Sequence, residues 1–335
     1  MGERRNNPTP SIKEVNWIIR VNMTKKSGYR IVVEDCLAVK NHESVLVLTD
    51  DKKLEIGQSL YEVAKELSKE AVLMVMKPRK VSGEEPPEEV AKAMLNFDVI
   101  ICPTSTSITH THAKINAVKN GARLASMPGI TGDMFEAGAI TADYAEVEAL
   151  TMKFTDLLTN ATTAKIEKDG HVLEMSLQNR NGVPSTGIYR SPGEAGNLPS
   201  GEAYIAPIED SANGSIVIDG SMVSIGLLKS PLIAKIKDGK LVGLEGEDAE
   251  KLGVLFESEN NSTVGELGIG TNHAARLTGV ILEDEKIYGT IHIAFGTNIS
   301  FGGTNKANCH LDGIVMNPTL YLDNKKVMDK GKVLI

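Results

Sequence analysis

The first half of the chain alternates short apolar runs with stretches in which apolar residues recur every three or four positions. The run Ser44–Asp50 precedes such a stretch at 56–67, where charged residues separate the apolar ones. Three more apolar runs follow, each separated from the next by helical spacing, at 71–77, 98–105 and 122–129. A last amphipathic helix is predicted over 143–160. This alternation predicts an α/β unit in which helices flank a parallel sheet.

From about residue 161 the apolar positions recur with a period of two, and turn signals appear every few residues. The segment 233–246 predicts a hairpin, because Asp238-Gly239 supplies the positive backbone angles of a tight turn. One helix is expected near 246–253. Because 335 residues exceed one average core, we expect two domains, an α/β domain at 1–160 and a mainly β (α+β) domain at 161–335.

Composition narrows the kinds of partner. A net charge of -8 and a pI near 5.5, with no cluster of Lys and Arg, argue against nucleic-acid binding. No apolar run approaches the ~18 residues that span a bilayer, and segment 1–14 has arginines without a following apolar stretch. We therefore expect a cytoplasmic protein with no membrane partner. Cys36, Cys102 and Cys309 fit no disulfide framework and are expected to be reduced thiols.

The segment NKANCHLDGI, 305–314, concentrates metal-competent side chains. In an extended strand, His310 and Asp312 project from one face about 6.6 Å apart, so both can reach one ion. Cys309 then faces away and is interpreted as a small buried hydrophobe. The alternative is that His310 is a hydrogen-bonded structural histidine and Asp312 a turn residue ahead of Gly313.

Three other strands each carry one metal-competent side chain among apolar residues: Glu202, Glu266 and His292. Glycines flank Glu266, and Gly in a strand is tolerated where the backbone passes close to a bound group. A buried carboxylate also needs a partner. Together with His310 and Asp312 they supply three carboxylates and two imidazoles, which is typical of two divalent cations such as zinc, cobalt or manganese.

These five residues, in the motifs NLPSGEAYIAP, GELGIGTN, HIAFG and CHLD, carry a resemblance to the metallopeptidase family of aminopeptidase T and aminopeptidase S. The resemblance implies an α/β domain followed by a β-rich metal-binding domain, two metal ions held by five such ligands, and a homodimer. It also implies an enzyme that removes N-terminal residues from peptides. Glu266 would then be both a metal ligand and the catalytic acceptor of a proton from water.

Two departures from that family point to a related one. The peptidases carry a tyrosine seven residues after the ligand histidine, where this chain has Ile299. In length and in the motifs LPSG, EDSANGS, CHLD and LYLDNK the chain is also similar to the 2,5-dihydroxypyridine dioxygenases of the same superfamily. That resemblance implies one ferrous ion bound by two histidines and an aspartate. Those enzymes, however, have a histidine where Glu266 stands and no acidic residue at the Glu202 position.

Histidines outside these strands are second-tier candidates. His110 follows the third apolar run, at the edge where open α/β sheets bind ligands, and its position resembles that of an active-site base in the dioxygenases. His112 could reach a substrate as well. The alternative for both is a helix start rich in capping Ser and Thr. His273 is interpreted as a surface histidine at a helix start.

The leading hypothesis is a metal-dependent hydrolase of aminopeptidase type, with two Zn, Co or Mn ions that activate water and a peptide or small-molecule substrate. The alternative is a mononuclear Fe(II) ring-cleaving dioxygenase, with His292, His310 and Asp312 as ligands and His110 as base. A third hypothesis is a catalytically inactive metal-binding homologue, which the missing tyrosine favours.

Overall fold

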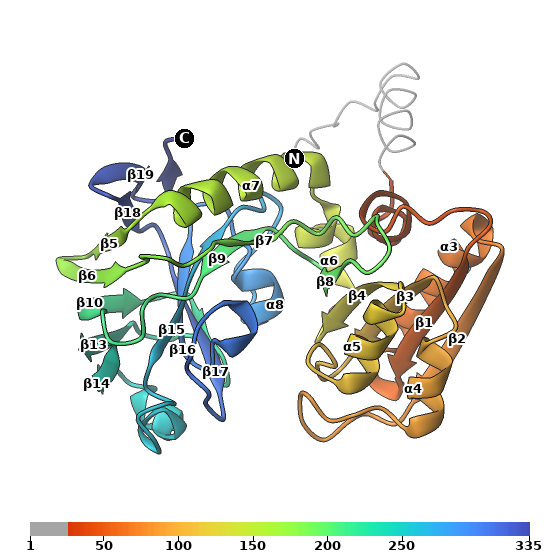
Figure 1. The fold of residues 1–335 in the computed structure, drawn as a ribbon, viewed down its shortest axis with the longest axis horizontal. Coiled ribbons are helices and arrows are strands. Elements are labelled where there is room, and N and C mark those ends of the chain that lie inside the picture. Colours follow the sequence, from red (N-terminus) through yellow and green to blue (C-terminus); the bar gives the residue numbers. More distant parts are fainter. Residues whose placement is uncertain (1–25) are drawn as a thin grey trace, which may run out of the picture.

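The structure, a computed structural model, describes residues 26–335 and has an α/β half beside a β-rich half (Figure 1). The N-terminal segment 1–14 considered above lies outside the described residues. In the α/β half five parallel strands have the order β2-β1-β3-β4-β8. Their bounds are β1 (Ser44–Asp50), β2 (Glu70–Met76), β3 (Val99–Thr104), β4 (Arg123–Pro128) and β8 (Ala195–Asn197). The predicted parallel sheet is confirmed.

Helices cover both faces of this sheet, so its central strands β1, β3 and β4 are buried on both sides. In β1, Val45 and Val47 join one core layer with the first helices, whereas Leu46 and Leu48 join the opposite layer with α4 and α5. The helical segments of this half are α2 (Gly28–Arg30), η1 (Ile31–Cys36), η2 (Asp51–Lys53), α3 (Leu54–Leu67), α4 (Glu88–Met94), α5 (His112–Lys119), α6 (Asp133–Glu136), η3 (Ala139–Thr141) and α7 (Tyr144–Asn160).

The β-rich half is built from two antiparallel sheets. One has the order β14-β13-β10-β6-β5-β18-β19-β20, with β5 (Thr163–Lys168), β6 (His171–Ser176), β10 (Asn213–Ile218), β13 (Leu232–Lys237), β14 (Lys240–Glu245), β18 (Thr319–Leu322), β19 (Lys325–Asp329) and β20 (Lys332–Val333). The other has the order β12-β11-β17-β16-β15-β9-β7, with β7 (Val183–Ser185), β9 (Glu202–Ile205), β11 (Ser221–Met222), β12 (Gly226–Leu227), β15 (Val264–Gly270), β16 (Ile291–Gly296) and β17 (His310–Val315). The mainly β second half is therefore confirmed.

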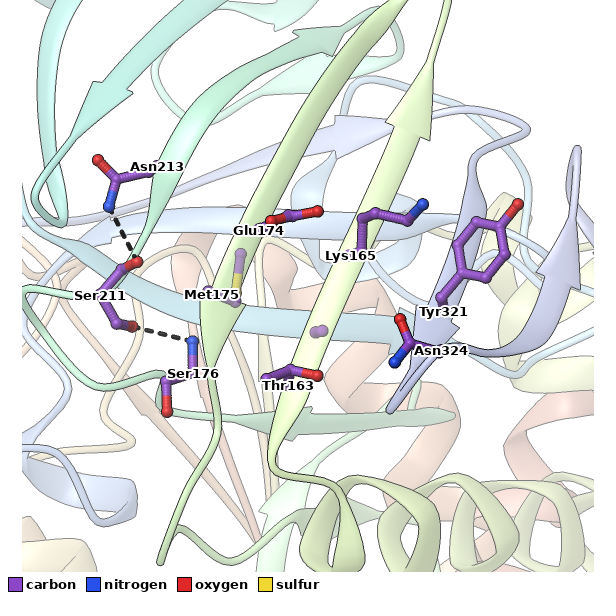
Figure 2. A pocket seen from close by; sticks show the side chains of 10 residues that line it. Thr163, Lys165, Glu174, Met175, Ser176, Ser211, Asn213, Tyr321 and Asn324 are labelled. Atoms are coloured by element: carbon purple, nitrogen blue, oxygen red, sulfur yellow. Dashed lines mark hydrogen bonds between the residues drawn. The ribbon is translucent and has the colours of Figure 1, made fainter.

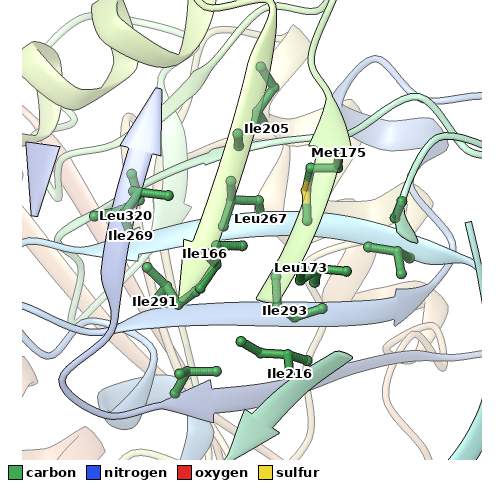
Figure 3. Close-up of a cluster of buried hydrophobic side chains, with 14 of the residues drawn as sticks. Ile166, Leu173, Met175, Ile205, Ile216, Leu267, Ile269, Ile291, Ile293 and Leu320 are labelled. Carbon is green, nitrogen blue, oxygen red and sulfur yellow. The ribbon is translucent and has the colours of Figure 1, made fainter. Parts of the chain in front are cut away.

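The two antiparallel sheets share one apolar core. Ile166 and Leu173 of the eight-stranded sheet pack with Leu267 and Ile293 of the seven-stranded sheet (Figure 3). Alternation along each strand sends these side chains inward and leaves the opposite face of the seven-stranded sheet for polar residues. Helix α7 packs on the same core through Phe154 and its neighbours. The core thus fixes the face on which the predicted metal ligands lie.

The hairpin and the helix that the sequence predicts in the second half are both present, with small differences in their bounds. The hairpin joining β13 and β14 turns at Asp238 and Gly239, with φ of 47° and 73°. The helix expected near 246–253 is the 3-10 helix η4 (Ala249–Phe256). Strand β8 lies beyond residue 160 but pairs with β4, so a segment from the second part of the chain completes the first sheet. No helix within residues 26–335 is long and apolar enough to cross a membrane.

Candidate metal centre

Four neighbouring strands of the seven-stranded sheet position the predicted ligands. Glu202 lies on β9, Glu266 on β15, His292 on β16, and His310 with Asp312 on β17. The strands are hydrogen-bonded in the order β17-β16-β15-β9, so residues far apart in sequence become cross-strand neighbours. The structure therefore brings all five together.

A first cluster consists of Glu266, His310 and Asp312, whose ligand atoms all lie within 4.8 Å of one another. His310 Nε2 is 3.4 Å from both Glu266 Oε2 and Asp312 Oδ1. His310 Nδ1 lies 2.8 Å from the carbonyl oxygen of Thr297, which can only accept, so the proton belongs on Nδ1. Nε2, which faces the two carboxylates, is thereby the nitrogen that would bind a metal after losing its proton, and the ring is held in orientation.

A second cluster consists of Glu202, Glu285 and His292, again with ligand atoms within 4.8 Å of one another. It differs from the first because Lys286 is part of it. Lys286 Nζ lies 2.5 Å from Glu202 Oε1 and forms a second ion pair with Glu285. The Lys286 side chain is 0% exposed. The structure thus groups His292 with Glu202 and Glu285, whereas Glu266 completes the trio with His310 and Asp312.

His292 joins the two clusters. Its Nε2 is 3.0 Å from Glu266 Oε1 and 3.5 Å from Glu202 Oε2, so it donates between two carboxylates. Gly268 makes room for the ring, since a Cβ there would stand 2.0 Å from His292 Nε2. His292 Nδ1 is buried without a hydrogen-bond partner among the described residues. A buried nitrogen without a hydrogen-bond partner lowers the stability of the fold by about 1–3 kcal/mol. Native proteins retain such groups mainly at functional positions.

The electrostatics of this region favour positive charge. Burial raises the pKa of Glu266, but hydrogen bonds from His292 and His310 outweigh it and bring that pKa to about 2. Burial lowers the pKa of His292, yet its bond to Glu266 and the charge of Glu202 raise it to about 9. Burial, partly offset by Lys286, raises the pKa of Glu285 to about 8. In the metal-free protein the surrounding carboxylates therefore favour the cationic form of both imidazoles, and a bound metal ion would take the place of a ring proton.

The first cluster opens into a cavity of about 560 Å³ between the two halves. The α/β half contributes Ser105, Pro128 and Gly129, at the carboxyl ends of β3 and β4, where open α/β sheets bind ligands. The β-rich half contributes an aromatic wall. The Phe301 ring meets the rings of Tyr204 and His310 edge-on, at centroid distances of 5.3 and 5.9 Å. This is room for a small ring-shaped ligand beside the cluster.

A comparison hollow lies on the eight-stranded sheet (Figure 2). It has a volume of about 460 Å³, but Glu174 is its one carboxylate and its lining contains no histidine or cysteine. It therefore lacks the donor set of the interdomain cavity.

The second-tier histidines separate into one that faces the cavity and two that do not. His110 lines the cavity, and burial, followed by the charges of Lys114 and His310, lowers its pKa. His112 is exposed at the first residue of α5. His273 stacks on Tyr288 at 3.8 Å, away from the cavity lining. Ile299, at the position of the peptidase tyrosine, is 53% exposed.

Sequence reasoning missed Glu285, Lys286 and the aromatic wall. Glu285 and Lys286 belong to LEDEKIYG (282–289), in which four consecutive charged residues resemble an exposed turn. Glu283 and Asp284 are in fact fully buried with Lys286. No periodic signal in the sequence indicates this, because the burial comes from the turn between α8 (Ile281–Asp284) and β16 folding against Gly270 and Asn272.

The donor set fits a divalent transition metal. Carboxylate oxygens and imidazole nitrogens suit iron, manganese or zinc, and no thiolate takes part. Cys309 lies half-buried with its Sγ 4.0 Å from the Asn261 carbonyl. The role of the five residues as ligands remains a prediction, which their convergence and the unpartnered His292 Nδ1 support.

Solved structures share this fold. The structure of 2,5-dihydroxypyridine dioxygenase from Pseudomonas putida aligns with a TM-score of 0.76 at 21% identity, over 92% of this chain and 96% of that one. Wild-type AmpT from Thermus thermophilus aligns with a TM-score of 0.66 at 15% identity, over 92% and 98% of the two chains. At such identities both show the fold alone, an α/β half with a β-rich half.

Sequence comparisons distinguish between the two. The curated 2,5-dihydroxypyridine 5,6-dioxygenase of Pseudomonas putida is 29% identical over 168 residues, which cover 45% of this chain and 48% of that protein. The match thus spans about half the length of the curated relative. The family model for 2,5-dihydroxypyridine 5,6-dioxygenase covers residues 28–335. Membership of the aminopeptidase family is not supported beyond the shared fold, and the chain belongs to the 2,5-dihydroxypyridine 5,6-dioxygenase family.

Proposed function

We propose that the protein is a metal-dependent dioxygenase that opens a small hydroxylated aromatic ring, with one divalent cation at Glu266, His310 and Asp312. The observation that carries this proposal is the position of this cluster in a cavity with aromatic walls, with His310 Nε2 free to coordinate. The family supports it, since its members are named for ring-cleaving chemistry. The alternative hypothesis drawn from the sequence is thus favoured over the hydrolase.

The cluster differs in composition from the usual oxygenase triad. Non-haem Fe(II) oxygenases commonly use two histidines and one carboxylate on one face of the ion. Here His310 is accompanied by the two carboxylates of Glu266 and Asp312, and His292 stands behind Glu266 at 3.0 Å. A ferrous ion bound by this set would supply the redox chemistry that molecular oxygen requires. The protein side chains hold it, neutralise its charge and keep the imidazole aligned.

The cavity supplies what a ring substrate needs. Tyr204 and Phe301 offer apolar faces on which a planar ring can pack. His110 lines the same cavity, and its lowered pKa keeps its imidazole neutral near pH 7, in the form that accepts a proton. We assign it the role of base toward a ring hydroxyl. Ser105, Thr109 and Asn197 add polar groups that can orient ring heteroatoms and hydroxyls.

A hydrolase of aminopeptidase type is the second candidate, because one observation favours it. Glu202, Glu285 and His292 form a second potential metal cluster next to the first, as a dinuclear hydrolase would need. Lys286 within that cluster, and the exposed Ile299 where the peptidases have a tyrosine, weigh against it.

The two candidates differ in metal, co-substrate and product, so one pair of assays separates them. Protein loaded anaerobically with Fe(II) is mixed with 2,5-dihydroxypyridine, and oxygen uptake and loss of ring absorbance are followed. In parallel, protein loaded with Zn²⁺, Co²⁺ or Mn²⁺ is given leucine p-nitroanilide. We expect equimolar consumption of oxygen and ring in the first assay and no nitroaniline in the second. Nitroaniline release without oxygen uptake would overturn the proposal.

Matched histidine variants control for stability. His310→Ala should abolish oxygen uptake, whereas His112→Ala, which changes an exposed histidine of α5, should leave it at the wild-type rate.

A further inference from the structure

The second cluster already contains a cation that belongs to the chain. Lys286 Nζ sits 2.5 Å from Glu202 Oε1 and is also paired with Glu285, the two carboxylates that a metal at this cluster would use. Glu202 Oε2 faces His292 Nε2 at 3.5 Å, so both oxygens of Glu202 have partners. Both oxygens of Glu202 and one oxygen of Glu285 are therefore engaged without an added ion, whereas His292 Nδ1 has no partner among the described residues.

The backbone holds Lys286 in this position. Its N–H donates to the Glu283 carbonyl at 3.0 Å, and its own carbonyl accepts from the Asn272 N–H at 2.8 Å. The Asn272 side chain in turn donates to the carbonyls of Ser200 and Ala139. The turn also presses on β15, since a Cβ on Gly270 would meet the Ile287 carbonyl oxygen at 2.0 Å. The side chain is completely buried, with its ammonium against Glu202 and Glu285.

Charge decides what this arrangement can bind. The two clusters together present four carboxylates, those of Glu202, Glu266, Glu285 and Asp312. With all four ionised they carry a charge of -4, which one ammonium and one divalent cation reduce to -1, and which a cationic His292 would bring to zero. A second divalent cation would make the group positive. That second ion would also share Glu202 with an ammonium at contact distance, in a buried region where like charges repel strongly.

We propose that the ammonium of Lys286 takes the place of a second metal ion, so that this chain binds a single divalent cation, at Glu266, His310 and Asp312. The inference rests on the proposed function, because it presupposes a metal at that cluster. It specifies how a superfamily fold that offers two adjacent clusters is limited to one ion in this protein. Lys286 acts through Glu202 and Glu285 and is a positioning residue.

The test counts ions and asks whether they are coupled. The full chain is stripped with a chelator, dialysed against Mn²⁺ alone, and measured for manganese content and by electron paramagnetic resonance. Three proteins are compared: wild type, Lys286→Met, which keeps the unbranched side chain but removes the charge, and Lys168→Met. Lys168 is a matched control, since it is a largely buried lysine paired with Asp219 on the other sheet.

We expect about one Mn²⁺ per chain and an isolated six-line signal for wild type and Lys168→Met, and about two with an exchange-coupled signal for Lys286→Met. Two ions in wild type, or one in a folded Lys286→Met, would overturn the inference and leave the proposed oxygenase metal site standing. No Mn²⁺ in wild type would instead contradict the metal site itself.

A second variant keeps the test decisive if Lys286→Met does not fold. In Glu285→Gln, wild-type manganese content supports the inference, because Glu285 then serves Lys286 and not a metal. A content that falls below wild type contradicts it.

Discussion

Two clusters of the same residue types lie side by side on one sheet, and they differ in what stands next to them. Glu266, His310 and Asp312 open into the cavity, and a backbone carbonyl sets the tautomer of their imidazole. Glu202, Glu285 and His292 instead enclose a lysine that is completely buried. Carboxylates and imidazoles alone therefore do not define a metal site. Because Glu202 and Glu285 line the same cavity as the first cluster, the difference that we propose to decide where the ion binds is the neighbouring ammonium of Lys286.

The largest effect is expected at the cluster of Glu266, His310 and Asp312. His310→Ala removes the one imidazole of that cluster, so activity should fall to background. The affinity for Fe(II) should fall by more than the 10–100-fold that is typical when a residue supporting a metal ligand is lost. His273→Ala, which changes a histidine stacked on Tyr288, is the control. Metal content and oxygen uptake measure both. Undiminished iron in His310→Ala would show that the ion binds elsewhere.

The next largest effect concerns two buried cations, Lys286, whose place a metal ion can take, and Arg123, which has only a structural role. Arg123 pairs with Glu43 through two hydrogen bonds of 2.7 and 2.8 Å in the α/β half. Lys286→Met and Arg123→Met each leave buried carboxylates unpaired, so each should lower the free energy of unfolding of the metal-free protein by about 3–5 kcal/mol. Urea melts measure this loss. Mn²⁺ should restore stability to Lys286→Met alone, because Glu202 and Glu285 form a potential metal cluster with His292, whereas Glu43 belongs to none of the clusters found among the described residues.

A third prediction concerns the opposite wall of the cavity. If His110 accepts a proton from the substrate, His110→Asn should lower kcat/KM by about 100-fold. Because the pKa of His110 is lowered from 6.5, the neutral form persists to more acidic pH, and wild-type kcat/KM should decline only below pH 6.5. That acidic decline should be absent in His110→Asn. An unchanged pH profile in the variant would remove His110 from the reaction.

The smallest effect is the stabilisation of the wild type by its own metal. An ion that binds the folded state alone raises the free energy of unfolding by about 1.4 kcal/mol when its free concentration is ten times Kd. Thermal melts with Mn²⁺ and with a chelator measure it. Glu266→Gln should lose this stabilisation, whereas the exposed pair formed by Lys92 and Glu88 can be broken by Lys92→Ala without altering it. Equal stabilisation of Glu266→Gln would place the ion outside the first cluster.

Much of the fold follows from local pattern. Two-sided burial in 44–50 and alternation in the second half predict a parallel sheet and antiparallel sheets, because periodicity reports which faces are covered. The pairing of β8 with β4 does not follow, since a three-residue strand carries no periodic signal. The helical segments over 28–36 do not follow either, because they depend on the burial of Val32, Val33 and Cys36 in a core shared with the sheet.

The candidate metal ligands could be predicted from residue types alone, but their division into two clusters could not. Single Glu and His residues among apolar strand positions stand out, and the sheet order brings them together. The division of those residues into two clusters depends on Lys286, whose burial arises from contacts with residues more than ten positions away. The sequence pattern predicts two metal ions, whereas we propose one because the Lys286 ammonium lies in the second cluster.

The central claim is that the first cluster binds the single metal ion of the chain. Crystals of the full chain grown with Fe(II) under anaerobic conditions, with diffraction measured on both sides of the iron edge, test it most directly. The account predicts one anomalous peak, bounded by Glu266, His310 and Asp312, with Lys286 Nζ still against Glu202. A peak at Glu202, Glu285 and His292, alone or together with the first, would contradict it.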